Sequence, residues 1–262
     1  KVDVDQMHGI EIEEWPARIA EVAMWLIDHQ MNQKVGEAFG TPVLRLPLKK
    51  SAKIVVANAL RVGWGDVLPE SRCSYVLGNP PFVGKKEQNP EQKRDMAAVW
   101  ADIKGAGTLD YVTCWYRIAA KYMKGTQAAA AFVSTNSISQ GEQVGILWKS
   151  LFAQGVSIQF AHRTFAWTSE ARGKAQVHVV IIGFSHAERK PKLLFDYDKS
   201  TGPTATVAAN ISPYLVAGPN ITIVRADRPL SVGAPEMTKG SEVTDDGHLL
   251  LNEQERKQIA KE

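Results

Sequence analysis

Residues 75–82 have the sequence YVLGNPPF, and this stretch decides how the chain is interpreted. The apolar run 75–78 is typical of a short buried strand. The next four residues, Asn79–Phe82, end that strand abruptly, because proline has no backbone N–H to donate to a strand ladder. We call these four residues the NPPF turn. A rigid polar turn with an aromatic ring, placed at the end of a strand, indicates a ligand site.

The segments around this turn alternate between strand-like and helical patterns. The apolar side chains of residues 13–32 recur every three or four positions, as on one face of a helix. Further strands are predicted at 7–12, 52–60, 128–135, 157–162 and 176–185, further helices at 109–123 and 141–155, and a polar loop with some helix at 83–108. This alternation predicts an α/β fold with a mostly parallel sheet and helices on both faces. The last two strands leave no room for a crossover helix, so we expect the final strand to be antiparallel.

The composition is that of an ordinary globular chain. Its 262 residues are 44% hydrophobic and 23% charged, with a formal net charge of +3 and a sequence pI near 8.8. This slightly basic balance is compatible with a polyanionic partner but does not by itself predict one. No apolar run approaches the length of a membrane span. Cys73 and Cys114 lack metal-ligand and CxxC spacing, which argues against a zinc site or disulfide framework and predicts a cytoplasmic protein.

The amino-acid composition changes after about residue 200. The preceding part, 1–200, is predicted to be one α/β domain, and 201–262 a linker followed by the start of an incomplete β-rich unit, because Gly, Pro, Thr and Ser become frequent there. Asn252, with Glu255 three residues later, is typical of a capped helix start. The chain begins with Lys1 and runs almost at once into a strand, so we expect it to be a fragment of a longer protein.

The NPPF turn has a specific chemical use. Pro80 holds Asn79 extended, so the Asn79 side-chain oxygen and the Pro80 carbonyl can point rigidly in one direction. Two such acceptors suit a planar –NH₂ group, and the ring of Phe82 can lie against the ring that carries it. An adenine amine is a poor nucleophile, and acceptors that bind its protons more strongly in the transition state would activate it. Asn-Pro is also a common turn initiator, so the tetrapeptide alone leaves a purely structural role open.

The turn matches the signature [DNS]PP[YFW] of amino-methyltransferases that use S-adenosylmethionine. More widely, the chain resembles the adenine-N6 DNA methyltransferase domain of MmeI-like, single-chain (type IIG) restriction–modification enzymes. The stretches that carry the resemblance are GIEIEEWPARIAEVAMWLIDHQMN, NALRVGW, GNPPFVGKK, LDYVTCWY, AFVSTNSISQGEQVGILW, AHRTFAWTSEARGKAQVHVVIIGF and GHLLLNEQE. They span nearly the whole chain. The resemblance implies a Rossmann-like class I methyltransferase fold, S-adenosyl-L-methionine as cofactor and double-stranded DNA as partner.

The resemblance also implies roles for individual residues. The catalytic set would be Asn79, Pro80, Pro81 and Phe82. Glu11 would accept hydrogen bonds from the cofactor ribose hydroxyls, and Ile12 would pack on the cofactor adenine. Asn58, next to Ala59, would accept from the cofactor adenine amine, where the family often has an acid. Asp66 is the competing candidate for that last role.

Two further groups of residues have roles on the DNA side. In the predicted loop between the last two strands, Phe165 matches the family's aromatic residue that stacks on the flipped base, with Trp167 as runner-up. A ring packed in a local core is the other interpretation of Phe165. The basic residues that follow the NPPF turn could contact phosphates or form part of a solvated mixed-charge surface; they are Lys85, Lys86, Lys93 and Arg94.

The resemblance is incomplete at both ends. The family's glycine-rich cofactor loop and its nuclease domain would precede residue 1, and its target-recognition domain would follow about residue 262. We therefore expect residues 1–262 alone to bind S-adenosylmethionine poorly and not to methylate DNA, which calorimetry can test. A protein-glutamine N5-methyltransferase, an RNA adenine methyltransferase and a degenerate DNA-binding module remain as alternatives.

Overall fold

The computed structural model describes residues 2–40, 51–167, 177–198 and 202–223. All of them belong to one compact unit, Lys1–Val224. Residues 225–262, with the predicted helix start at Asn252, lie outside the described part. None of the described helices is long and apolar enough to cross a membrane.

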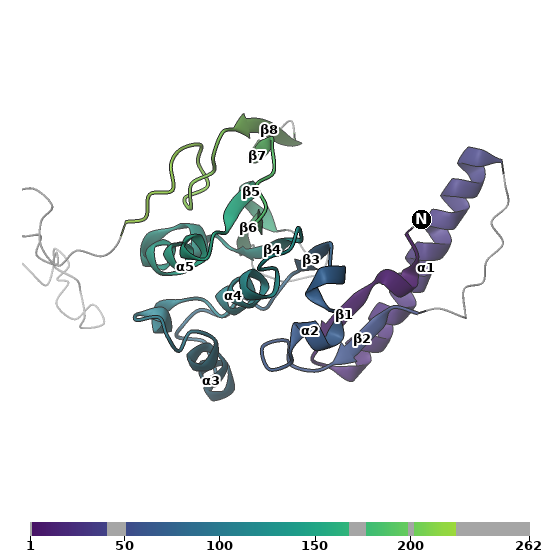
Figure 1. Ribbon diagram of the computed structural model, residues 1–262, viewed down its shortest axis with the longest axis horizontal. Helices are drawn as coiled ribbons and strands as arrows, with labels where there is room; N and C mark the ends of the chain where they lie inside the picture. The colour runs from purple at the N-terminus through teal and green to yellow at the C-terminus, as the bar shows by residue number, and fades with distance from the viewer. Residues whose placement is uncertain (1, 41–50, 168–176, 199–201, 224–262) are drawn as a thin grey trace, which may run out of the picture. The chain divides into compact units, whose positions relative to one another are not determined.

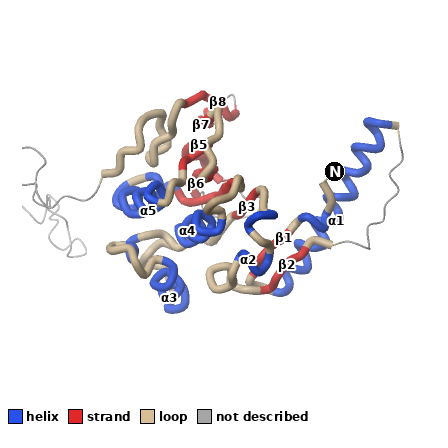
Figure 2. Tube along the Cα trace, in the orientation of Figure 1, coloured by secondary structure: helices blue, strands red, loops and turns tan. Residues whose placement is uncertain are grey.

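The strands form two sheets, which can be followed in Figure 1 and, by colour, in Figure 2. The first is a parallel pair, β1 (His8–Glu11) and β2 (Lys53–Val56), in which Glu11 is opposite Val56. The second has the order β3-β4-β6-β5-β7-β8. Its strands are β3 (Tyr75–Gly78), β4 (Ala129–Thr135), β5 (Ser157–Trp167), β6 (Val177–Ser185), β7 (Lys192–Asp198) and β8 (Gly202–Ala208).

Strand directions agree with the predicted α/β fold. β3 is parallel to β4 and β5 is parallel to β7, while β6 is antiparallel to both β4 and β5. The strands β3, β4, β5 and β7 therefore run in one direction, and β6 and β8 run against them. The mostly parallel sheet is confirmed, as is the antiparallel strand β6. The ends of β3 and β5 consequently lie at the same edge of the sheet, which is where open α/β sheets bind ligands.

Five α-helices connect and cover the described strands. They are α1 (Glu14–Phe39), the short α2 (Trp64–Val67), α3 (Pro90–Val99), α4 (Thr113–Tyr122) and α5 (Gly141–Ala153). α3 is the helix inside the predicted loop 83–108. It begins where the Asn89 side chain accepts from the backbone N–H of Gln92 at 2.9 Å and the Gln92 side chain accepts from Asn89 N in return.

The core lies between the six-stranded sheet and the helices α4 and α5. Tyr116 of α4 stacks on Phe184 of β6, with ring centroids 5.1 Å apart, and meets Trp148 of α5 edge-on at 6.0 Å. Its hydroxyl is 2.7 Å from the hydroxyl of Ser134 on β4, so the buried polar atom is satisfied. These contacts fix α4 against the sheet, and α4 in turn forms one wall of the site described below.

The structure differs from the sequence-based expectation in two places. β5 continues to Trp167, so Phe165 lies in a strand and not in the predicted loop. The cause is continued pairing with β6: after a register shift between His162 and Phe165, Phe165 is opposite Val179 and Trp167 is opposite Val177. In addition, the compact unit runs to Val224 and not to residue 200, because β8 pairs with β7 along its whole length.

The apolar stripe of α1 is exposed within the described part of the chain. The predicted helix is present and runs seven residues further than expected, to Phe39. The stripe residues retain large accessible areas; they are Trp15, Ile19, Val22, Leu26, Ile27, Met31, Val35 and Phe39. Among described strands, β1 pairs only with β2, and β3 only with β4. This part of the unit therefore presents open strand edges and an apolar helix face.

Candidate active site

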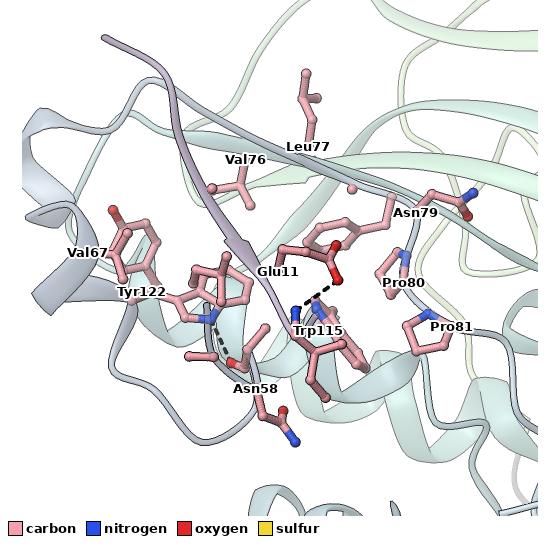
Figure 3. Close-up of a pocket in the computed structure, with 18 of the residues that line it drawn as sticks. Glu11, Asn58, Val67, Val76, Leu77, Asn79, Pro80, Pro81, Trp115 and Tyr122 are labelled. Atoms are coloured by element: carbon pink, nitrogen blue, oxygen red, sulfur yellow. Dashed lines mark hydrogen bonds between the residues drawn. The ribbon is translucent and has the colours of Figure 1, made fainter. Parts of the chain in front are cut away.

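A cavity of about 610 Å³ lies where β1, the segment after β2 and the NPPF turn meet. Its volume is within the range of small-molecule sites. In the view of Figure 3, Glu11 lies between Asn58 and Asn79. The cavity brings together most of the predicted site residues: Glu11, Ile12, Asn58, Ala59, Asn79, Pro80 and Pro81. These come from separate strand ends, so only the fold unites them.

The two acceptors of the NPPF turn differ in exposure, because Asn79 is exposed while Pro80 is buried beside the cavity. Neither the Asn79 side chain nor the Pro80 carbonyl is hydrogen-bonded to the described residues. The preceding residue is glycine for a reason of space, since a Cβ on Gly78 would lie 3.3 Å from the ring of Phe132. The turn is thus held closely against the sheet on its strand side while its acceptors stay free.

The exit of the turn is clamped by a buried carboxylate. Asp110, which is 4% exposed, accepts from the backbone N–H of Val83 at 3.1 Å. The next residue, Tyr111, donates its own backbone N–H to the Val83 carbonyl at 3.0 Å. Both backbone groups of the residue after Phe82 are therefore fixed to the segment that begins α4. Phe82 itself is half-buried against the hydrophobic core and is not among the residues that line the cavity.

Glu11 has one carboxylate oxygen engaged by the backbone. Its Oε1 accepts from the N–H groups of Ile12 and Glu13 at 2.9 and 3.2 Å. These bonds fix the carboxylate at the end of β1, and Figure 3 draws the first of them. The second oxygen makes no hydrogen bond to the described residues, so it can accept from a ligand. Ile12 is exposed and offers an apolar surface beside it.

Two residues, Asn58 and Asp66, are candidates for accepting a hydrogen bond from the cofactor adenine amine, and Asn58 lines the cavity. Asp66 is not among the residues that line the cavity. The Asn58 side-chain oxygen accepts from the backbone N–H of Leu60 at 2.8 Å, and its –NH₂ group donates to Asp95 at 3.2 Å. The neighbouring carbonyl of Ala59 accepts from the indole N–H of Trp64 at 2.8 Å. The segment after β2 is therefore tied down on both sides of Asn58.

Sequence reasoning missed several cavity residues. Trp64, Trp115 and Tyr122 add aromatic surface, and Asp95 and Tyr111 add a buried polar pair. A signal existed for Trp115, because it lies next to Tyr116 on α4 but outside the apolar face that the helical period assigns to the core. No local pattern marks Asp95, whose importance depends on contacts with residues 34 and 37 positions away.

The structure does not bring Phe165 into this cavity. Phe165 lies in β5 and stacks on Tyr197 of β7, with ring centroids 4.5 Å apart. Trp167, the runner-up, is 6.2 Å from Phe165 and is exposed. Both rings lie at the end of β5, the sheet edge at which the NPPF turn follows β3.

The two cysteines should differ strongly in reactivity. Burial raises the pKa of the Cys114 thiol to about 12, so almost no thiolate forms there at pH 8. Cys73 is partly exposed and lines the cavity. We expect iodoacetamide to label Cys73 and leave Cys114 unmodified in the folded protein, as peptide mass spectrometry can measure. Equal labelling of both cysteines without denaturant would contradict the buried position of Cys114.

Comparison with known proteins shows to which family the chain belongs. The sequence model of the family described as "MmeI, DNA-methyltransferase domain" matches residues 1–196. DNA methyltransferase A of Bacillus subtilis (strain 168) is 40% identical over 253 residues, which are 95% of this chain and 28% of that protein. The structure of the type IIL restriction–modification enzyme MmeI in complex with DNA is similar over 100% of this chain and 35% of that one, with 48% identity and a TM-score of 0.88. The chain thus spans about a third of the length of these relatives, and it belongs to the family of the MmeI DNA-methyltransferase domain.

Proposed function

We propose that the protein is a site-specific DNA methyltransferase that moves a methyl group from S-adenosyl-L-methionine to the N6 amine of a flipped adenine. The observation that carries this proposal is the pair of free acceptors, Asn79 Oδ1 and the Pro80 carbonyl, beside a cavity that also contains Glu11 and Asn58. The proposal includes a place in a restriction–modification enzyme, because MmeI is such an enzyme.

The cavity residues suit the cofactor. Glu11 has an unengaged carboxylate oxygen for the ribose hydroxyls, Ile12 gives apolar surface, and Asn58 has an oxygen that retains one lone pair. Trp64, Trp115 and Tyr122 add flat aromatic surface for a purine. When bound, S-adenosylmethionine supplies an electrophilic methyl group on a sulfonium sulfur.

The residues of the chain would activate the nucleophile by orientation. Asn79 Oδ1 and the Pro80 carbonyl would each accept a hydrogen bond from one N–H of the adenine amine. As the nitrogen bonds to carbon it becomes positive, so both hydrogen bonds strengthen toward the transition state. The surplus proton then leaves the methylated nitrogen for solvent. No strong base is required, and rigid placement of the two acceptors accounts for the two prolines.

Phe165 is proposed to stack on the extruded adenine. Its support is its position at the sheet edge shared with the NPPF turn, and the ring of Tyr197 braces it from β7. Base–aromatic stacking is worth roughly 1–3 kcal/mol. We expect Phe165→Ala to lower kcat/KM for DNA about tenfold and to reduce the fluorescence rise of 2-aminopurine placed at the target base.

A matched control comes from the same cluster. Tyr197→Leu removes the ring that stacks on Phe165 but not Phe165 itself, so it should have a smaller effect on base extrusion. If Phe165→Ala left both the fluorescence rise and the kinetics unchanged, Phe165 would be a packing residue only.

The cofactor site is proposed to be completed by a glycine-rich loop and strand that precede residue 1 in the full-length protein. The open edges of β1 and β3 and the exposed apolar stripe of α1 support this, because such surfaces are normally covered. Residues 1–262 alone should then bind the cofactor poorly.

A target-recognition unit would lie mainly beyond residue 262. Phosphate contacts would come from basic residues after the turn: Lys85, Lys86, Lys93 and Arg94.

The test uses the full-length protein. It is incubated with mixed-sequence duplex DNA and S-adenosylmethionine, the DNA is digested to nucleosides, and N6-methyladenine is measured by mass spectrometry. Formation of N6-methyladenine supports the proposal. If varied DNA yields none while RNA or a protein glutamine amide is methylated, the substrate assignment is wrong. If nothing is methylated, the fold serves as a binding module.

A further inference from the structure

We infer that Asp95 is a positioning residue that fixes Asn58 at the cofactor end of the cavity and, through Tyr111, the exit of the NPPF turn. This inference deepens the proposed function and rests on it for its kinetic part. Its structural part concerns one buried carboxylate and its three donors, and that part can be tested without activity.

Asp95 is buried on α3, with 6% of its surface exposed, and it lines the cavity. Its Oδ1 accepts from Arg61 Nε at 2.7 Å. Its Oδ2 accepts from the Tyr111 hydroxyl at 2.8 Å and from Asn58 Nδ2 at 3.2 Å. Burial alone would raise the pKa of Asp95, but the Arg61 guanidinium and the other two donors hold it below its ordinary value. The carboxylate is therefore ionised at neutral pH.

An ionised Asp95 leaves Asn58 one orientation. The Asn58 –NH₂ group faces the carboxylate, and the Asn58 oxygen faces the backbone N–H of Leu60. Flipping the amide would oppose oxygen to carboxylate and –NH₂ to N–H, which loses both hydrogen bonds. The side-chain oxygen is thus held at one place in the cavity wall. Without Asp95, only the Leu60 contact would hold it.

The same pairing explains why position 58 carries an amide. A carboxylate there would lie about 3 Å from Asp95, and two like charges at that distance disfavour joint ionisation. Asn58 and Asp95 are therefore a matched neutral and charged pair. The pair can be exchanged: Asn58→Asp combined with Asp95→Asn restores one amide and one carboxylate.

Tyr111 extends the arrangement to the catalytic turn. Its hydroxyl donates to Asp95, and its backbone N–H donates to the carbonyl of Val83, the residue after Phe82. Burial and the neighbouring carboxylate raise the pKa of Tyr111, so the hydroxyl keeps its proton and remains a donor. Val83 directly follows the NPPF turn, so a displacement of Tyr111 would reach the turn through a single residue. The acceptors of that turn must be placed accurately.

The kinetic test uses the full-length protein and measures methylation of DNA by four variants. We expect Asn58→Ala to raise KM for S-adenosylmethionine about tenfold with little change in kcat. Tyr111→Phe should lower kcat several-fold with little change in KM, and Asp95→Asn should change both about tenfold. Asp196→Asn is the matched control, because Asp196 also pairs with an arginine, Arg163 at 3.0 Å, but does not line the cavity.

The exchange variants separate positioning from a merely structural role. Asn58→Asp should raise KM for the cofactor and lower the melting temperature by about 3 °C, and adding Asp95→Asn should recover most of both. If Asn58→Asp instead lowered KM, the family's usual acid would simply bind better and the inference would be wrong. It would also be wrong if Asp95→Asn left KM and kcat unchanged in an active enzyme.

Failure of the proposed function has a different outcome. If the unmodified full-length protein methylates nothing, the function is wrong, and the melting temperatures of the exchange variants still decide the pairing of Asn58 with Asp95. Recovery in the double variant would then support the pairing, and no recovery would overturn it.

Discussion

Replacing Asn79 with alanine in the full-length protein is expected to reduce methyl transfer to DNA by about 10²–10³-fold in kcat. The reason is that the Asn79 oxygen is a free acceptor, and its hydrogen bond to the amine would strengthen only as the amine becomes positive. Single-turnover assays with radioactive S-adenosylmethionine measure the change. KM for the cofactor should hardly move, because the side chain is exposed and supports no other described contact.

Two companion variants make this result interpretable. Asn79→Asp retains an oxygen acceptor and should keep most of the activity. Asn220→Ala changes an exposed asparagine in the loop after β8, outside the cavity, and should leave the rate unchanged. If Asn79→Ala were as active as Asn220→Ala, the NPPF turn would be only a structural end to β3, and the mechanism proposed here would fail.

The sequence was sufficient for the architecture because its signals are local. Helical periodicity in α1, α4 and α5 and the apolar runs of β3 and β4 each lie within about 26 residues. The antiparallel direction of β6 followed from the short connection after β5. The boundary after β8 could not be read in this way, because Gly- and Thr-rich composition does not reveal that β8 pairs with β7.

The site was predicted only where a residue carries its own chemistry. Glu11 is the last residue of β1, Asn58 follows β2 and Asn79 follows β3; all three were predicted from the sequence, and the cavity unites them. Asp95 and Tyr111 were missed because their importance depends on contacts with residues far away in the sequence. A mixed-charge helix such as α3 is usually solvated, and only the fold turns one of its carboxylates inward to three donors.

The two carboxylate oxygens of Glu11 have different partners, and this gives a specific expectation for a substitution there. Glu11→Gln keeps an oxygen that can accept from Ile12 N–H, so the turn into α1 should survive. It replaces the free oxygen by an –NH₂ group that cannot accept from a hydroxyl, and it removes the negative charge. A hydrogen bond to a charged group contributes about 1.5–3 kcal/mol, so KM for S-adenosylmethionine should rise about 10–100-fold while kcat changes little.

Glu13→Gln provides the matched control, because Glu13 is an exposed glutamate two residues away that does not line the cavity. Equilibrium binding of S-adenosylhomocysteine to the full-length protein, followed by calorimetry, should show the same loss for Glu11→Gln and none for Glu13→Gln. Weakened binding with unchanged kcat would place Glu11 on the cofactor and away from the reacting atoms. If instead kcat fell and binding of S-adenosylhomocysteine were unchanged, Glu11 would act on the chemical step. The assignment of cofactor binding to Glu11 and of chemistry to the NPPF turn alone would then be wrong.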